Sequence, residues 1–488
     1  MTEIVNCVRR GTVPFSLREN RDSPRRVVLS GLLGAMVALI CCAAAAGQSV
    51  WEVTPYRIRL LVAFAPLPEL TPQLQADLMT GLVDRTDALV GAAWDLSAAP
   101  APPQLARQML SAVDSVTLES LPQESLQFDK VMLLVVGRAG YCNRVAAREL
   151  DLRTRLWSPS VSRPAGQLGK LCDVALDTIF GAFAPLALVS RVEGVEVKLR
   201  PKAGGLPPRD RSLRLINIGD AFRPVVRYND RDGNPRRITP IAWTYLAVKQ
   251  LGPEEVTCRL FTGLRSPLSG RRRGRVEQLA LGVVPPQRPS TLVLKARSEQ
   301  KQVLPGYDVY SHPPDSIATV LVGRSDRRGS VLVPPAANPL RVLLVKNGSE
   351  LLARLPLVPG LQPTFTAEIP NDDGRLEAEG FITGLQEELV DLVTRREVLL
   401  AQTKSRTKAE KFEEAKRLVE QLQRLPTAAE FSRKLKEQRE KIRSGDAATG
   451  AKIDALFDDT QKLLQKHLGG DEIEAVWQQL RKAASPGT

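Results

Sequence analysis

Histidine is nearly missing from this 488-residue sequence, which contains only His312 and His467. A serine hydrolase needs a histidine to accept the proton of its nucleophile, and the sequence has no G-x-S-x-G motif either. A zinc site needs clustered ligands, but H-E-x-x-H is absent and no two cysteines have C-x-x-C spacing. We interpret both histidines as surface or interface residues. The sequence therefore predicts no catalytic residue, no metal site and no cofactor.

Aromatic residues are also scarce, at 5% of the chain, so we expect cores built from aliphatic side chains. Hydrophobic residues nevertheless make up 43% of the sequence, which excludes wholesale disorder. The length allows about three domains if each takes about 100 to 200 residues. No repeat of fixed period is present, so repeat architectures are excluded.

Charged residues are absent from residues 27–46, a run that ends in small residues. The preceding 26 residues are rich in arginine: Arg9, Arg10, Arg18, Arg21, Arg25 and Arg26. This arrangement is typical of a secretory signal, and we expect residues 1–47 to be a signal peptide with the mature chain beginning between Gly47 and Ser49. An uncleaved anchor is the alternative, because about 20 apolar residues span a bilayer. Both interpretations place the rest of the chain outside the cytoplasm, in the periplasm or cell envelope.

Three cysteines follow the predicted signal: Cys142, Cys172 and Cys258. Outside the cytoplasm they allow one disulfide and one spare thiol. Cys142 enters a predicted strand and Cys172 lies on a helix predicted to cross the same sheet. We therefore expect a Cys142–Cys172 disulfide and a buried Cys258. The net charge of +14 permits binding to anionic envelope polymers or lipids.

Residues 51–190 alternate between predicted strands and helices. Apolar residues at 56, 58, 60 and 62 alternate with arginines, as in a strand with one wet face. Thr71 and Pro72 begin a predicted helix, and Pro103 begins another. Residues 128–136, which are all apolar from Val131 onward, are predicted to form a central strand. A returning strand over 145–156 and a long helix over 167–188 complete the expected α/β domain.

A resemblance to known envelope proteins rests on three segments: Phe128-Asp129-Lys130-Val131, Gly140-Tyr141 and residues 151–157. With the order of elements, they make residues 51–190 resemble the amino-terminal domain of the Tol translocation protein, the curli secretion lipoprotein and a flagellar outer-membrane accessory protein. The resemblance implies a fold and a tendency to bind protein partners. It implies no site residues, since a shared fold does not transfer a site.

Residues 192–265 are predicted to form a small β-barrel. Asp230, Asp232 and Asn234 are spaced like the first ligands of a calcium loop, but Pro235 stands where such a loop needs glycine, so we interpret the segment as a hairpin turn. A basic linker is expected over 266–290. It contains the one dense basic cluster, a possible anion-binding site made of Arg271, Arg272, Arg273 and Arg275.

Residues 291–380 are predicted to form a β-sandwich-like domain. Strands over 319–322 and 330–333 flank a turn of Asp and Gly type, which resembles the small add-on domains of carboxypeptidase-regulatory type that act as adhesive spacers. A further hairpin is expected around Gly348. Asp372 and Asp373 are interpreted as part of a turn.

Residues 381–488 change to helical periodicity. Phe381, Leu385 and Leu389 begin an apolar stripe, and Thr427 with Glu430 has the spacing of a capping box. From residue 385 onward there are 20 Lys and Arg against 18 Asp and Glu. This near balance favours helix pairing through ion pairs, in a helical or coiled-coil-like module that binds envelope proteins or itself. We expect no nucleic-acid partner.

The sequence thus predicts an α+β multidomain protein with an α/β sandwich-like amino-terminal domain, a small β-barrel and β-sandwich midsection, and an α-helical carboxyl-terminal module. The favoured function is that of a non-enzymatic exported cell-envelope protein, a scaffold or accessory factor for protein partners. The alternative is an enzyme acting on envelope polymers through paired carboxylates such as Glu254 with Glu255 or Asp372 with Asp373. These pairs are adjacent in sequence, so in a strand they would point to opposite faces.

Overall fold

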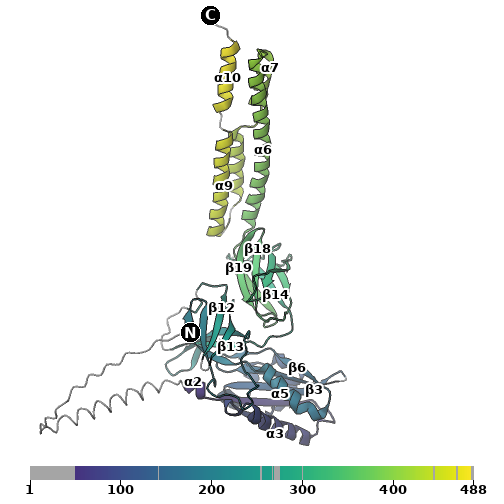
Figure 1. Cartoon of the computed structure of the whole chain (residues 1–488). Helices are drawn as coiled ribbons and strands as arrows, with labels where there is room; N and C mark the ends of the chain where they lie inside the picture. Colours follow the sequence, from purple (N-terminus) through teal and green to yellow (C-terminus); the bar gives the residue numbers. More distant parts are fainter. Residues whose placement is uncertain are drawn as a thin grey trace, which may run out of the picture.

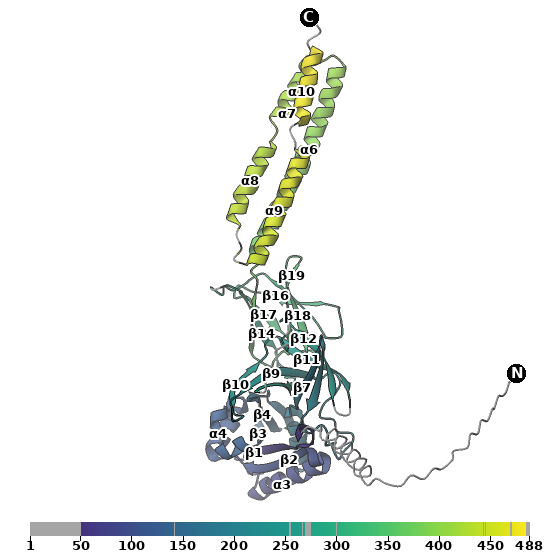
Figure 2. The same ribbon diagram turned by 90° about the vertical axis from the view of Figure 1, so that its left-hand side faces the viewer.

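The computed structural model describes residues 50–140, 142–252, 255–265, 267–268, 275–298, 300–442, 444, 446–468 and 471–484. It is an α+β multidomain protein, as predicted: an α/β part and a barrel lie together, a β-sandwich follows, and a helical module extends from the sandwich as a rod (Figures 1 and 2). The last helix that the structure describes lies at the far tip of the rod (Figure 1).

The α/β part is built on a six-stranded mixed sheet in the order β2-β1-β3-β4-β5, with β6 also paired to β4. Its strands are β1 (Tyr56–Phe64), β2 (Trp94–Pro100), β3 (Lys130–Ala139), β4 (Cys142–Asp151), β5 (Leu156–Trp157) and β6 (Val161–Ala165). Strand β1 runs parallel to β2 and β3, and β4 runs antiparallel to β3. Leu61 and Ala63 of β1 are buried. The face of β1 that was predicted to be exposed to solvent is therefore covered over the second half of the strand.

Three helices cover this sheet. Helices α3 (Pro72–Leu89) and α5 (Leu171–Ala182) pack on one face, and α4 (Pro103–Ala112) packs on the other. Thr71 caps α3 as predicted, because its hydroxyl accepts a hydrogen bond from the backbone N–H of Leu74 at 3.3 Å. The helix predicted over 167–188 is shorter than expected. Pro185 explains this end, since it has no N–H to donate and disfavours helical geometry in the residue before it.

The barrel follows directly. Its strands are β7 (Leu186–Glu193), β8 (Glu196–Pro201), β9 (Ala221–Asn229), β10 (Pro235–Pro240), β11 (Thr244–Leu251), β12 (Val256–Thr262) and β13 (Val276–Gly282). The order β9-β11-β12-β8-β7-β13 closes because β13 also pairs with β9, and β10 extends β9 as a hairpin. The hairpin turn is confirmed: one carboxylate oxygen of Asp230 accepts the N–H groups of Asp232 (3.0 Å) and Asn234 (2.8 Å).

The expectation of a linker over 266–290 is wrong for β13. This strand closes the barrel by pairing with both β7 and β9. Leu279 packs with the core of the α/β part and Ala280 with the core of the barrel, so β13 is buried on both faces. The position of β13 depends on its pairing with β7 and β9, which are distant in sequence. The basic residues that precede β13 do not indicate this pairing.

The β-sandwich packs a three-stranded sheet, β17-β14-β20, against a four-stranded sheet, β16-β15-β18-β19. Its strands are β14 (Ser290–Ala296), β15 (Asp308–His312), β16 (Val320–Arg324), β17 (Ser330–Val333), β18 (Arg341–Asn347), β19 (Glu350–Leu357) and β20 (Thr364–Ile369). Strands β18 and β19 pair as the predicted hairpin around Gly348. Strands β16 and β17 lie at the expected positions, but they belong to different sheets and do not return on each other as a hairpin. Gly348 has φ of 60° in the tight β18–β19 turn, a conformation that favours glycine.

The helical module contains α6 (Asp373–Lys408), α7 (Phe412–Gln423), α8 (Ala428–Lys441), α9 (Ala447–His467) and α10 (Asp471–Ala484). Helix α6 starts before the predicted boundary at 381 and spans about 54 Å at 1.5 Å per residue. Helices α8 and α9 pack on its first half, and α7 and α10 on its second half. The capping box of Thr427 and Glu430 is confirmed. No coiled coil is evident in the described part of this module, which is instead a bundle of short and long helices.

Candidate functional site: the joint between the sandwich and the helical module

The two histidines lie apart and have no catalytic setting. His312 is the last residue of β15, and its ring donates through Nδ1 to the carbonyl oxygen of Pro313 at 2.8 Å. His467 is exposed at the end of α9. Within the described ranges, no group of three or more His, Cys, Asp or Glu side chains could hold a metal ion. These residues therefore assemble no recognisable reaction centre.

Asp372 and Asp373 lie where α6 leaves the sandwich. The predicted turn is wrong here, because Asp372 is the N-cap of α6 and Asp373 is the first residue of that helix. Asp372 is buried and is bound by the buried guanidinium of Arg375. Nε of Arg375 donates to both carboxylate oxygens at 2.9 Å, and Nη2 donates to Oδ2 at 2.6 Å. Charge-assisted bonds of this forked kind are the strong ones among protein hydrogen bonds. Asp372 is therefore engaged by a cation, whereas Asp373 is exposed.

Arg375 also reaches across to the sandwich. Its Nη2 donates to the carbonyl oxygen of Asn347 at 2.9 Å, at the end of β18. A further ion pair joins it to Glu379, one turn along α6. The hydrogen bonds to Asp372, with those to Glu379, raise the pKa of Arg375 above its already high ordinary value. The guanidinium thus stays charged and ties the first turn of α6 to β18.

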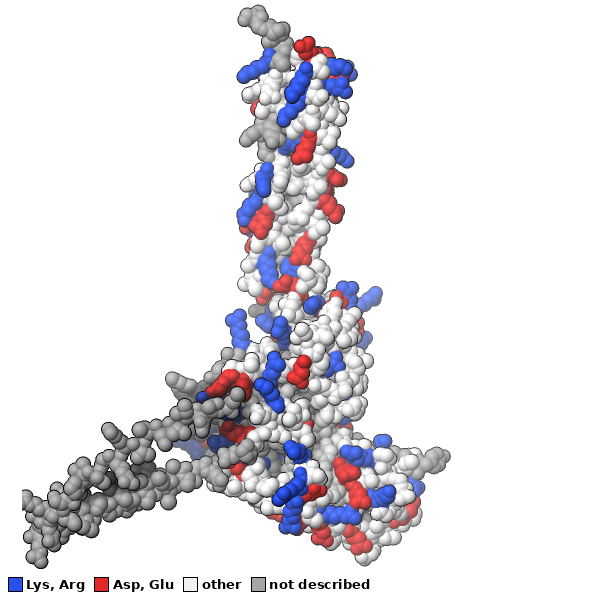
Figure 3. All heavy atoms as spheres, viewed as in Figure 1, with Lys and Arg blue, Asp and Glu red and all other residues white. Residues whose placement is uncertain are grey.

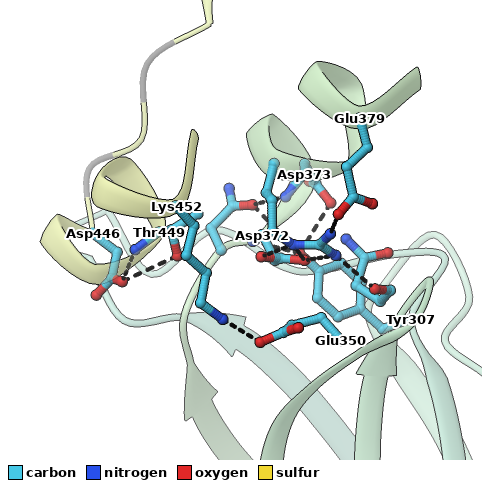
Figure 4. Close-up of polar contacts among 11 residues, drawn as sticks. Tyr307, Glu350, Asp372, Asp373, Glu379, Asp446, Thr449 and Lys452 are labelled. Atoms are coloured by element: carbon cyan, nitrogen blue, oxygen red, sulfur yellow. Dashed lines mark hydrogen bonds and ion pairs between the residues drawn. The ribbon is translucent and has the colours of Figure 1, made fainter. Parts of the chain in front are cut away.

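Tyr307 supplies the second tie. Its hydroxyl accepts the backbone N–H of Asp372 (3.0 Å) and donates to a carboxylate oxygen of Asp373 (2.9 Å). Burial raises the pKa of Tyr307, and the negative charge of Asp373 adds to the rise. The hydroxyl therefore stays protonated and can hold both contacts. Figure 4 shows Tyr307 beside the start of α6, above the strands of the sandwich.

Helix α9 makes a third tie at the same level. Lys452 forms an ion pair with Glu350 of β19, which lowers the pKa of that carboxyl (Figure 4). Asp446 caps α9 by accepting the N–H of Thr449 at 3.0 Å. Both side chains of the ion pair are partly exposed, so this tie adds little stability by itself. The ion pair instead positions α9, because it holds this second helix against the sandwich.

Sequence reasoning missed Tyr307 and Arg375. A signal for Arg375 is present, because it falls on the stripe of α6 that continues with buried Ala378, Ile382 and Leu385. A charged residue on a buried stripe needs a partner, and Asp372 lies three residues before it. No comparable signal marks Tyr307, whose contacts join positions 65 and 66 residues apart.

A second buried ion cluster joins the α/β part to the barrel. Nζ of Lys130 donates to Glu149 (2.6 Å), to Asp151 (3.1 Å) and to the carbonyl oxygen of Ala184 (2.7 Å), just before β7. Tyr56 also contacts this junction, since its hydroxyl accepts the N–H of Leu186 at 2.9 Å. Lys130 and Asp151 belong to the stretches that carry the Tol and curli resemblance, and their role here is structural.

The other predicted site residues are not brought together. Arg271, Arg272 and Arg273 lie outside the described residues, and Arg275 is exposed just before β13, so the anion-binding cluster stays a prediction. Glu254 also lies outside them. Glu255 accepts a hydrogen bond from Arg200 at 3.4 Å. Of the described carboxylates named for the enzyme alternative, Glu255 and Asp372 are bound by arginines and Asp373 by Tyr307.

The cysteines Cys142, Cys172 and Cys258 are free thiols in this structure, so the expected disulfide is not formed here. Cys142 is exposed at the start of β4. The sulfur of Cys172 lies against α3, 3.4 Å from where a Cβ at Gly81 would stand, which directs it toward that helix. Cys258 is buried as expected, and burial raises its pKa to about 12.

No protein-family model matches the chain, and no curated protein matches it. Similar solved structures include a PelC dodecamer from Paraburkholderia phytofirmans, at 11% identity over 26% of this chain and 87% of that chain, with a TM-score of 0.16. TolB from Acinetobacter baumannii is similar at 10% identity over 66% of this chain and 97% of that chain, with a TM-score of 0.18. The Bacillus anthracis TIE protein is similar at 8% identity over 43% and 46%, with a TM-score of 0.13. At such low TM-scores, no family and no function follows from these similarities.

Proposed function

We propose that this chain is a non-enzymatic exported protein of the cell envelope, a scaffold or accessory factor that presents its helical module to protein partners or to a second copy of itself. The observation that carries the proposal is the joint of Asp372, Arg375 and Tyr307. Buried, multiply bonded contacts at the base of α6 fix the direction of the module relative to the sandwich. A fixed projecting rod suits a protein that holds a partner at a distance.

Export rests on the sequence. The arginine-rich start and the uncharged run over 27–46 support a signal peptide or an anchor, and with it a periplasmic or envelope location. Those residues lie outside the described part of the chain. Among the helices that the structure describes, none has the length and apolar character needed to cross a bilayer.

The surface of the helical module supports protein contact over binding to one charged polymer. Figure 3 shows blue and red side chains interspersed along the rod, with no broad patch of one sign on this face. Val390 and Val398 of α6 remain exposed, at 64% and 49%. Exposed aliphatic side chains among mixed charges suit a protein partner. Binding of anionic polymer or lipid would depend on the separate arginine cluster at 271–275.

The test is a comparison of residues 48–488 with residues 48–371, a cut that leaves out the whole of α6. Both proteins are used in pulldowns from envelope fractions and in thermal melts. We expect the shorter protein to melt cooperatively and to lose the partners that the longer protein captures. A second arm uses the full mature chain with Val390→Glu and Val398→Glu, and Leu321→Glu on the sandwich is the matched control because Leu321 is also exposed.

Three results would count against the proposal. An unfolded 48–371 protein would make the helical module part of the core. A folded 48–371 protein that keeps every partner would place the function elsewhere, most simply in the α/β part. Equal loss of partners in the α6 variant and in the Leu321→Glu control would show that the exposed face of α6 is not the contact.

A further inference from the structure

A cavity of about 440 Å³ lies between the barrel and the sandwich. Its volume falls in the range of about 300 to 1,000 Å³ that small-molecule sites have. Strands β8, β11 and β12 supply most of its wall, and two loops of the sandwich close one side with Asp315 and Asn338. The cavity belongs neither to the joint nor to the helical module.

Apolar side chains line this cavity without being covered. Val195 and Ile218 are 65% and 69% exposed, although large aliphatic side chains are normally buried. Ala247 stands directly opposite Arg259 in the β11–β12 register, and both residues line the cavity. Phe261 forms part of the wall beside it. An apolar group of a ligand would be stabilised here by covering these surfaces.

Charged side chains of both signs surround the apolar wall. Arg259 lies over the ring of Phe261, with its guanidinium carbon 5.3 Å from the ring centre, and Lys249 stands at the bulge of β11. Glu196 faces the cavity from β8, and Asp315 faces it from the sandwich. Among the residues that the structure describes, no ion pair engages any of these four side chains. They are therefore available to a ligand that carries both charges.

We propose that this cavity binds a short zwitterionic peptide with an apolar side chain. Its carboxylate would bind Lys249 and Arg259, and its ammonium would bind Glu196 and Asp315. Strands β8 and β11 lie on either side of β12, so Glu196 and Lys249 are two strand spacings apart, about 10 Å. An extended peptide of three residues spans about 10 Å. The spacing between Glu196 and Lys249 thus fits a peptide of this length, and Arg259, directly opposite Glu196, lies on the strand between them.

The probe is the tripeptide alanyl-leucyl-alanine, added to the full mature chain and measured by calorimetric titration. Three further peptides each remove one feature: an acetyl cap removes the ammonium, an amide cap removes the carboxylate, and alanyl-glycyl-alanine removes the apolar side chain. We expect each to bind about tenfold more weakly or worse, the scale of a lost charged hydrogen bond or a lost apolar contact. A doubly capped peptide mimics an internal segment of a partner protein.

Two pairs of variants locate the site. Ile218→Ser and Arg259→Gln should weaken binding of the free tripeptide about tenfold. Leu332→Ser is the control for the first, because Leu332 is 62% exposed on β17 and does not line the cavity, and Arg236→Gln on β10 is the control for the second. All four positions are exposed, so melting temperatures should stay unchanged. The proposal is overturned if the free tripeptide does not bind, if the doubly capped peptide binds equally well, or if the controls weaken binding as much as the cavity variants. None of these results depends on partners of the helical module.

Discussion

The ammonium of Lys130 lies 2.6 Å from a carboxylate oxygen of Glu149, and both side chains are buried, with exposures of 0% and 1%. Strands β3 and β4 bring them together, because Lys130 pairs with Asp151 in the register and Glu149 lies two residues away on the same face. The second carboxylate oxygen of Glu149 accepts the N–H of Ala184 at 3.0 Å. One ion pair thus holds the sheet of the α/β part to the chain that enters the barrel.

Replacing Lys130 should therefore cost much stability. Lys130→Met leaves Glu149 and Asp151 buried without their cation, and removing one partner of a buried pair costs about 3 to 5 kcal/mol. We expect a loss of that size in the free energy of unfolding, measured with urea. The matched control is Lys170→Met, since Lys170 is exposed. Neutralising the acids as well, in Lys130→Met with Glu149→Gln and Asp151→Asn, should recover part of the loss; no recovery would argue against an electrostatic origin.

The same cluster predicts a pH dependence. Burial raises the pKa of Glu149 from 4.5 to about 7, although the charge of Lys130 opposes the rise. The folded state therefore binds this proton more tightly than the unfolded state. The contribution of Glu149 to stability is complete below about pH 4.5 and is lost as the pH rises to about 7. Unfolding free energies measured between these values should fall for the natural protein relative to Glu149→Gln. Glu124→Gln, at an exposed glutamate, should follow the natural protein; parallel curves for all three would contradict the assignment.

Elements with local signals were predictable from the sequence. The start of α3 depends on Thr71 and Pro72, and the start of α8 depends on Thr427 and Glu430, all within one turn of the helix they begin. The β9–β10 turn is likewise made by Asp230 and residues at most four positions away. In each case the residues that stabilise the structure are neighbours in sequence, so their spacing was enough.

Features that depend on distant partners were missed. The strand β13 is defined by pairing with β7 and β9, which lie well before it in the chain. The start of α6 depends on Tyr307, and the burial of Lys130 depends on Glu149 and on Ala184. The cavity beside Ala247 likewise needs three strands and two sandwich loops to exist. The hydrophobic periodicity of one segment does not indicate which distant segments will pack against it.

The first residue of the mature chain is a prediction from sequence alone. If residues 1–47 are a signal peptide, protein purified from envelope fractions should begin between Gly47 and Ser49. Intact mass measures this directly. A mass that retains the first 46 residues would instead support the anchored form, in which about 20 apolar residues stay in the bilayer.

Arg375 gives the sharpest test of the joint. Arg375→Met leaves Asp372 buried and uncompensated, and it removes the bond to the carbonyl of Asn347. The expected loss in the free energy of unfolding is about 3 to 5 kcal/mol. Arg395→Met is the matched control, because Arg395 lies on the same helix and is exposed. Adding Asp372→Asn to Arg375→Met should recover part of the loss, since no buried charge is then left alone.

Stability alone would not show that the joint orients the module, so a second measurement is needed. Small-angle X-ray scattering of the Arg375→Met protein should show a broader distribution of long distances than the Arg395→Met protein, because α6 could then pivot on Tyr307 and on the exposed pair of Lys452 and Glu350. Limited proteolysis near Asn371 should be faster in the same variant, since a loosened first turn exposes its backbone. If stability falls while scattering and cleavage stay unchanged, Arg375 stabilises the sandwich edge without setting the direction of the rod, and a rigid scaffold would have to rely on Tyr307.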